Sequence, residues 1–117
     1  MQEFLKHKDQ RVVANCIEVL GKIGDRRLTQ ILKPYLENSN NRIMANAAVA
    51  VFRLGESKVL GYLQQALVSG SSSLRASAAF ALGEIGSSEV VELLIQGLLD
   101  EAQNVRNHVV QGLLKQD

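Results

Sequence analysis

The sequence predicts an all-α fold, a right-handed α-α superhelix built from stacked helical hairpins. The first observation behind this prediction is an internal period of 31 residues, which spaces Gly24, Gly55 and Gly86 equally. The second is that apolar residues within each period recur at i, i+3, i+4 and i+7, as in amphipathic helices. The third is a polar cluster between successive units. Because one hairpin cannot bury its apolar face alone, we expect each unit to stack on its neighbours.

Several further alignment columns keep the same step, which indicates true repeats rather than coincidence. The apolar columns are Val12, Ile43, Leu74 and Val105; Leu20, Val51, Leu82 and Leu113; Leu5, Leu36, Leu67 and Leu98; and Leu32, Leu63 and Leu94. Two columns hold small residues, which we expect to let first helices approach one another closely. They are Ala14, Ala45 and Ala76, and Cys16, Ala47 and Ala78.

The period predicts a single domain over residues 1–117, with about three full repeats and flanking half repeats. The full repeats lie near 9–39, 40–71 and 72–102, and the partial units are 1–8 and 103–117. In the first repeat, apolar positions between 12 and 23 predict the first helix, and those between 28 and 36 predict the second. Pro34 lies inside that second helix and removes a backbone donor, so we expect a kink or a late start there.

The ends of each first helix have their own signals. The glycine column suits the last turn, where a left-handed residue closes the helix and only glycine adopts that conformation without steric cost. The clusters between units are rich in Asn, Ser and Asp, which suit turns and helix N-caps. These clusters lie at residues 7–10, 38–41, 69–73 and 100–104.

Both ends of the chain cut a repeat. Met1 and Leu5 fall in columns of a second helix, and Asp117 falls in the glycine column. Self-contained solenoids usually carry atypical capping repeats, and none is evident. We expect either a fragment of a longer protein or a chain that completes its ends by self-association. A short natural protein with degenerate end helices is the alternative.

Composition excludes several classes of protein and site. With 46% hydrophobic and 21% charged residues in 117, the chain lacks the signature of disorder. A net charge of +1 gives no general attraction to nucleic acids or anionic membranes, and neither is expected as a partner. The single cysteine, Cys16, excludes an internal disulfide framework and a cysteine-based zinc site. Without a signal-peptide pattern or a long apolar run, we expect a cytoplasmic location.

The phrase SLRASAAFALGEIGSSEVVELLIQGLLDEAQNVR, residues 73–106, resembles the short bacterial type of HEAT repeat, also found in phycobilisome-lyase-like proteins. The likeness extends over essentially the whole chain. It implies first helices on a convex face and second helices on a concave face that commonly binds partners. The family's arginine is matched by Arg75 and Arg106, but Val13 and Met44 replace it in the earlier units, so the arginine ladder is interrupted there.

No residue pattern indicates catalysis, a metal or a cofactor. The resemblance extends to deoxyhypusine hydroxylases, which hold iron with His-Glu pairs just after the arginine position. Here that position holds Ala76-Ser77 and Asn107-His108 in the later units, so neither unit has a His-Glu pair. A lone His108 fits a surface histidine better than a ligand. Cys16, in a column of alanines, fits a small buried hydrophobe better than a nucleophile. We therefore expect a protein that is not an enzyme.

The outer side of the second helices carries the candidate site. Columns 29, 33 and 37 face away from the packing stripe, and they are polar in the first repeat but largely apolar in the next two. An exposed apolar patch of this kind usually marks a partner site. The alternative is that curvature buries these residues against the adjacent unit. The predicted partner-binding residues are Leu60, Val68, Val91, Ile95 and Leu99, with Lys33, Gln64 and Gln96 as a polar rim.

These observations favour a non-enzymatic module for protein-protein interaction or scaffolding that uses the concave face. The expected partner is another protein or a second copy of the chain, as in a homodimer, and no cofactor or metal is expected. The alternative, which rests on the resemblance alone, is a phycobilisome-lyase-like subunit for chromophore attachment or chaperoning.

Overall fold

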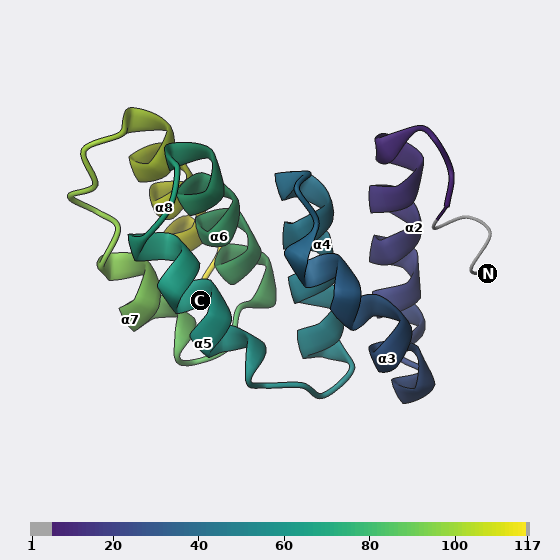
Figure 1. Cartoon of the computed structure of the whole chain (residues 1–117). Helices are drawn as coiled ribbons and strands as arrows, with labels where there is room; N and C mark the ends of the chain where they lie inside the picture. The colour runs from purple at the N-terminus through teal and green to yellow at the C-terminus, as the bar shows by residue number, and fades with distance from the viewer. Residues whose placement is uncertain (1–5, 117) are drawn as a thin grey trace. The chain divides into compact units, whose positions relative to one another are not determined.

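The protein is described by a computed structural model that covers residues 6–116. It forms two compact units, Met1–Ser57 and Lys58–Asp117. Within the described residues, every regular element is helical, with seven α-helices and two short 3-10 helices (Figure 1). The prediction of an all-α fold is therefore confirmed.

The N-terminal unit pairs two long helices and closes them with a broken one. The long helices α2 and α4 pack against each other, and the segments between them pack against α4 as well. The elements are α2 (Gln10–Ile23), η1 (Arg26–Leu28), α3 (Thr29–Leu32), η2 (Lys33–Glu37) and α4 (Asn41–Arg53). The predicted irregularity at Pro34 is confirmed, because the α-helix stops at Leu32 and a 3-10 helix carries the proline in its first turn.

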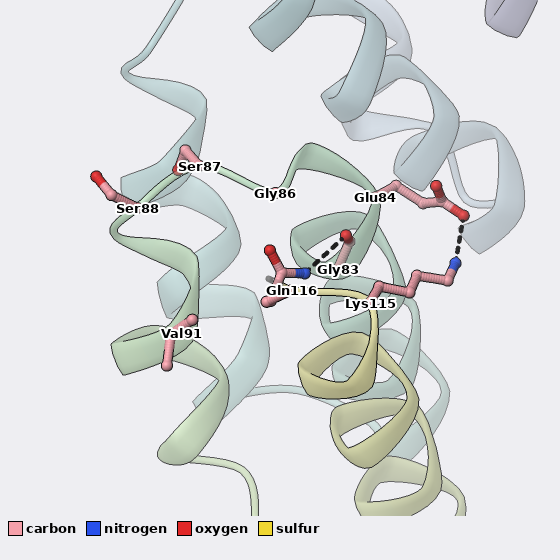
Figure 2. A pocket seen from close by; sticks show the side chains of 8 residues that line it. All are labelled: Gly83, Glu84, Gly86, Ser87, Ser88, Val91, Lys115 and Gln116. Carbon is pink, nitrogen blue, oxygen red and sulfur yellow. Dashed lines mark hydrogen bonds and ion pairs between the residues drawn. The ribbon is translucent and has the colours of Figure 1, made fainter.

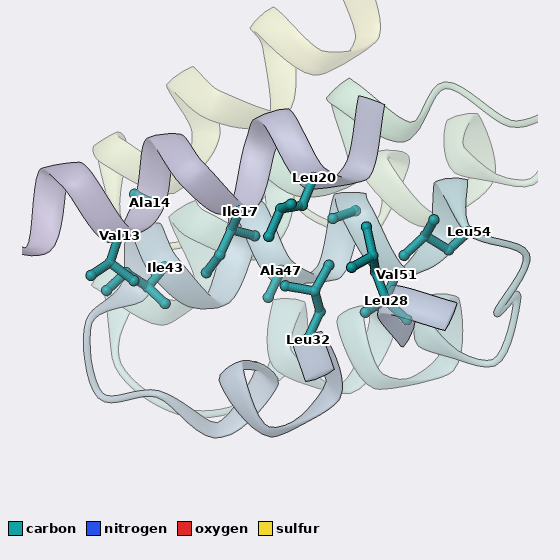
Figure 3. Packing of buried hydrophobic residues seen from close by; sticks show 11 residues of the cluster. Val13, Ala14, Ile17, Leu20, Leu28, Leu32, Ile43, Ala47, Val51 and Leu54 are labelled. Atoms are coloured by element: carbon teal, nitrogen blue, oxygen red, sulfur yellow. The ribbon is translucent and has the colours of Figure 1, made fainter. Parts of the chain in front are cut away.

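The core of this unit is aliphatic, and Figure 3 shows its side chains meeting between the helices. From α2, Ile17 and Leu20 point toward Val51 of α4, and Leu32 of α3 closes the cluster from the side. Cys16 is half-buried against the same cluster, which fits the small hydrophobe expected there. The second helix therefore stabilises the first-helix pair by covering one edge of it.

The C-terminal unit has two layers of helices. Its elements are α5 (Val59–Val68), α6 (Ser72–Ile85), α7 (Val90–Ile95) and α8 (Gln103–Leu114). The first helices α6 and α8 pack on each other, while α5 and α7 both pack against α6, and α7 also touches α8. The second helices α5 and α7 thus form a layer of their own over the α6–α8 pair (Figure 1).

The 31-residue step predicted from sequence is present in the helix starts. The first helices begin at Gln10, Asn41, Ser72 and Gln103. The polar clusters act as expected in three cases, because Asp9, Asn40 and Ser71 each accept a hydrogen bond from a backbone N–H of the first turn. Before α8 the N-cap position holds Ala102, which has no such side chain.

The glycine column ends first helices as predicted. Gly24 and Gly86 are C-caps in the left-handed region, with φ of 79° and 67°. A residue with a Cβ would be strained in this conformation, so the column marks where the chain leaves each helix.

First helices also approach each other closely at glycines that lie outside the two predicted small-residue columns. A Cβ built on Gly21 lies 2.6 Å from the Ala50 Cβ, and one built on Gly83 lies 2.7 Å from the Gly112 Cα. The small residues predicted to serve this purpose, in the columns of Ala14 and Cys16, lie one or two turns earlier. The crossing points are set by how the helices tilt across each other, which the 31-residue pattern does not contain.

Candidate functional site

The second-helix layer of the C-terminal unit carries exposed apolar side chains, as the sequence predicts. We call Val68, Val91, Ile95 and Leu99 the α5–α7 surface. Their exposed fractions are 62%, 36%, 51% and 95% respectively. Large aliphatic side chains are usually buried in a folded domain, so four of them on one layer form a candidate contact site.

The amphipathic pattern of α5 explains its part of this surface. Leu63 and Leu67 lie on its buried face, while Gln64 and Val68 lie on the exposed one. Leu60 is only 9% exposed, so the expectation that it belongs to the exposed set is wrong. On a helical wheel Leu60 lies beside Leu67 rather than beside Val68, and the 3.6-residue turn carries it to the packed side.

A close contact joins the ends of α5 and α7. A Cβ built on Gly97, just after α7, lies 2.6 Å from the Val109 Cγ2 and 3.6 Å from the Leu67 Cδ1. The backbone at Gly97 therefore lies against both α8 and the last turn of α5. Because Val68 follows Leu67 and Leu99 follows closely after Gly97, the two exposed side chains belong to adjoining ends of the two helices.

The segment that carries Leu99 is held in place by Arg75 and Asp100. The Arg75 Nε donates to Asp100 Oδ2 at 2.9 Å, and its Nη2 donates to Oδ1 at 3.1 Å. Asp100 Oδ1 also accepts from the Ala102 N–H at 2.9 Å. These hydrogen bonds, first from the Arg75 side chain and then from Ala102, hold the pKa of Asp100 below its usual value.

The two arginines that match the family pattern both bind this one aspartate. Arg75 pairs with the carboxylate, and Arg106 Nη1 donates to the backbone carbonyl of Asp100 at 2.6 Å. Both side chains of the Arg75–Asp100 pair are largely buried. The arginines therefore fix the loop beside the α5–α7 surface instead of forming a charged ladder.

The rim of the surface is polar and partly acidic. Gln64 and Gln96 are exposed, in line with the predicted rim. Glu89 is exposed at the N-cap of α7, and Glu92, which is exposed on the helix, lies one turn from Ile95. Lys33, also predicted for the rim, belongs to the N-terminal unit, where its Nζ lies 3.1 Å from Glu56 Oε2.

Val91 also borders a surface hollow of about 550 Å³ between the C-terminal ends of α6 and α8. Figure 2 shows the polar groups that line it. Gln116 Nε2 donates to the carbonyls of Gly83 and Gly112, and Lys115 Nζ lies 2.6 Å from Glu84 Oε1. The Gln116 amide and the Lys115 amine therefore find their partners within the C-terminal unit itself.

One polar atom in the hollow has no partner in the described part of the chain. The Ser87 hydroxyl oxygen is buried and makes no hydrogen bond. Ser87 occupies the repeat position of Asp25, whose carboxylate accepts from the Arg27 N–H at 3.0 Å. The hydroxyl therefore lies where the first repeat has a capping side chain, and its position follows from the repeat pattern.

The candidate chemical residues have local roles in the structure. His108 Nδ1 donates to the carbonyl of Asn104, one turn earlier on its own helix, at 2.8 Å. In residues 6–116 no group of three or more His, Cys, Asp or Glu residues is placed to hold a metal ion. Nor does any helix in that range have the length and apolar character that crossing a membrane requires.

The sequence also matches a known protein family. Residues 1–53 and 60–117 match the sequence model of HEAT repeats. The chain belongs to the HEAT-repeat family. No curated protein matches the sequence as a relative. HEAT repeats commonly mediate protein-protein interaction or scaffolding and are generally not catalytic.

Sequence reasoning missed two exposed apolar residues outside the α5–α7 surface. Tyr62 and Leu98 are 40% and 37% exposed, although their columns were assigned to the packed face. Leu98 differs from its repeat partner Leu67 because α7 ends at Ile95 and the chain turns there. The signal in the sequence was Gly97, which has no counterpart at the same position in the other repeats.

Proposed function

We propose that this HEAT-repeat protein binds a protein partner on the α5–α7 surface. The observation that carries the proposal is the exposure of Val68, Ile95 and Leu99 at the adjoining ends of two second helices. Burying each such side chain contributes up to about 1.5–3 kcal/mol before the costs of association are subtracted. Three of them make a favourable contribution of the same order as the cost of association, so further contacts of the partner with the polar rim add to the affinity.

The charge around the surface specifies the chemistry of the partner. Glu92 is exposed one turn from Ile95, Glu89 is exposed at the start of α7, and Gln64 and Gln96 add neutral hydrogen-bonding groups. An incoming segment is therefore complementary when its apolar side chains are flanked by lysine or arginine. An amphipathic helix is the simplest segment that presents apolar side chains in such a row.

Selection of binding peptides from a random library tests this proposal directly. Peptides displayed on phage are selected on the wild-type chain alone, and their binding is then measured on the double variant I95S/L99S. We expect selected sequences to have apolar residues at helical spacing with basic flanks. Synthetic versions should bind the double variant at least about tenfold more weakly in fluorescence anisotropy, because two contact side chains are lost.

The control changes two exposed apolar residues on another helix. Val19 and Ile23 on α2 are exposed to a similar degree as Ile95. The V19S/I23S variant should bind the selected peptides as the wild type does. Equal affinity of all three proteins, or a preference for acidic peptides, would remove the α5–α7 surface as the binding site.

The alternative function, a chromophore-attachment or chaperone subunit, stays a prediction. Its direct test is titration of the purified protein with a bilin pigment, followed by visible absorbance. A saturable spectral shift would support it, and an unchanged pigment spectrum would count against it.

A further inference from the structure

Two apolar faces outside the α5–α7 surface are left exposed on first helices. On α2 these are Val19 and Ile23, with 56% and 59% of their surface exposed. On α8 they are Val110 and Leu114, with 45% and 78% exposed. Each pair is spaced i, i+4, so its two side chains share one side of their helix.

The repeat register shows what the α2 face does elsewhere in the chain. Val19 aligns with Ala50 on α4 and with Gly112 on α8, one and three periods later. Ala50 is buried where α4 packs against α2, and Gly112 is buried where α8 packs against α6. The α2 face is therefore the side of a first helix that receives the first helix of the preceding repeat.

The α8 face is the opposite half of the same kind of junction. Leu114 aligns with Gly83 on α6 and with Gly21 on α2. Gly21 meets Ala50 across the α2–α4 crossing, and Gly83 meets Gly112 across the α6–α8 crossing. The α8 face is therefore the side that receives the first helix of a following repeat.

We propose that the chain associates head to tail with a second copy of itself, the α8 face of one copy packing on the α2 face of the next. The geometry of this contact follows the packing of α2 on α4 in the N-terminal unit and of α6 on α8 in the C-terminal unit. In that register, Leu114 of one copy lies against Val19 of the other, where the internal junctions have Gly21 against Ala50 and Gly83 against Gly112. Val110 and Ile23 extend the contact along the two helices.

A polar contact of the α2–α4 packing is available as well. Within the N-terminal unit, Asn46 Nδ2 donates to the Ala14 carbonyl at 2.9 Å. Asn15 aligns with Asn46, and Asn107 aligns with Ala14. Asn15 of the second copy therefore donates to the Asn107 carbonyl of the first in the proposed junction, which sets the register of the two helices.

Side-chain size and charge make this junction weaker than the internal ones. Leucine against valine keeps the helices farther apart than glycine against alanine or glycine. Glu84 of α6 pairs with Lys115, the C-cap of α8, within the C-terminal unit. The same register places Lys115 of one copy opposite Lys22 of the other, so two like charges meet in the proposed junction. The association is therefore reversible, and because the two faces differ, a single contact between two copies leaves one free face on each of them.

Mixing two variants tests this directionality. V19K blocks only the α2 face, and L114K blocks only the α8 face. Lysine has at least the helix propensity of the residues it replaces, so both variants should keep their helicity and melting temperature. Wild-type mass in analytical ultracentrifugation should rise with concentration beyond that of a dimer. Each variant alone should stay monomeric at concentrations where the wild type associates, because its dissociation constant should be at least about tenfold higher than that of the wild type.

An equimolar mixture of the two variants should form a heterodimer and nothing larger, because only one intact pair of faces remains. The control E18Q, at an exposed residue of α2 that points about 100° or more around the helix from Val19 and Ile23, should associate as the wild type does. If a lysine variant unfolds, V19S and L114S replace the pair. A wild type that is monomeric at every concentration, or a variant that still self-associates alone, would overturn the proposal.

A mixture of the two variants that stays monomeric would overturn the proposal equally. This test is separate from that of the α5–α7 surface. The I95S/L99S variant should self-associate like the wild type, and V19K should bind the selected peptides normally. Loss of self-association in I95S/L99S alone would assign the contact to the α5–α7 surface instead.

Discussion

Replacing Gly83 with alanine tests the packing that supports the C-terminal unit. The new Cβ would lie 2.7 Å from the Gly112 Cα, whereas ordinary contacts begin at 3.4 Å. The neighbouring atom belongs to the backbone of α8, so no side chain can rotate away. The helices α6 and α8 must therefore separate by about 0.7 Å.

The cost follows from two opposing effects. Overpacking of this kind costs about 1–3 kcal/mol, and a gap of 0.5–1 Å forfeits roughly a quarter to a half of the dispersion energy of the contacts along it. Alanine recovers about 1 kcal/mol because its helix propensity is higher than that of glycine. Since the clash is with backbone, we expect a net loss of about 1–2 kcal/mol in the free energy of unfolding.

The assay is thermal and urea denaturation followed by circular dichroism, with G61A as the matched control. Gly61 lies on α5 with no atom within 4 Å of its built Cβ, so alanine there gains propensity without a clash. G61A should raise the melting temperature, and G83A should lower it by about 5 °C or more. A G83A variant as stable as the wild type would show that α6 and α8 do not cross at this short distance.

Two predictions concern carboxylates. D100N should lower the melting temperature at pH 7, because Arg75 and the Ala102 N–H lose a charged acceptor. The pKa of Asp100 is depressed in the folded state. The contribution of its carboxylate to the free energy of unfolding is therefore complete above pH 3.8 and fades as the pH falls through the folded pKa. The melting difference between D100N and the wild type should therefore shrink on acidification, and a constant difference would contradict this account. Hydrogen bonds from the side chain and then the backbone of Arg27 lower the pKa of Asp25 to about 2. R27A keeps the backbone donor, so NMR titration of the carboxyl carbon should show a pKa raised toward 3.8 but still below it, and no rise would refute the side-chain contribution.

Much of the fold follows from local chemistry that the sequence shows directly. The 31-residue step, the N-caps at Asp9, Asn40 and Ser71, and the helix-ending Gly24 depend on a few neighbouring residues each. Such features are recognisable because caps and left-handed turns restrict which side chains fit. The apolar residues of the second helices were found in the same way, from columns that a solvated helix would make polar.

The sequence by itself determined the repeat, the helical class and most of the exposed apolar surface, because each depends on periodicity along one chain segment. Only the tertiary structure decided that Leu60 is buried, that Leu99 is carried by a turn after a short α7, and that Gly83 and Gly112 meet. Helix length and tilt are set by contacts between segments distant in sequence. A 31-residue pattern contains no record of those contacts, so the positions they control are defined only in the packed molecule.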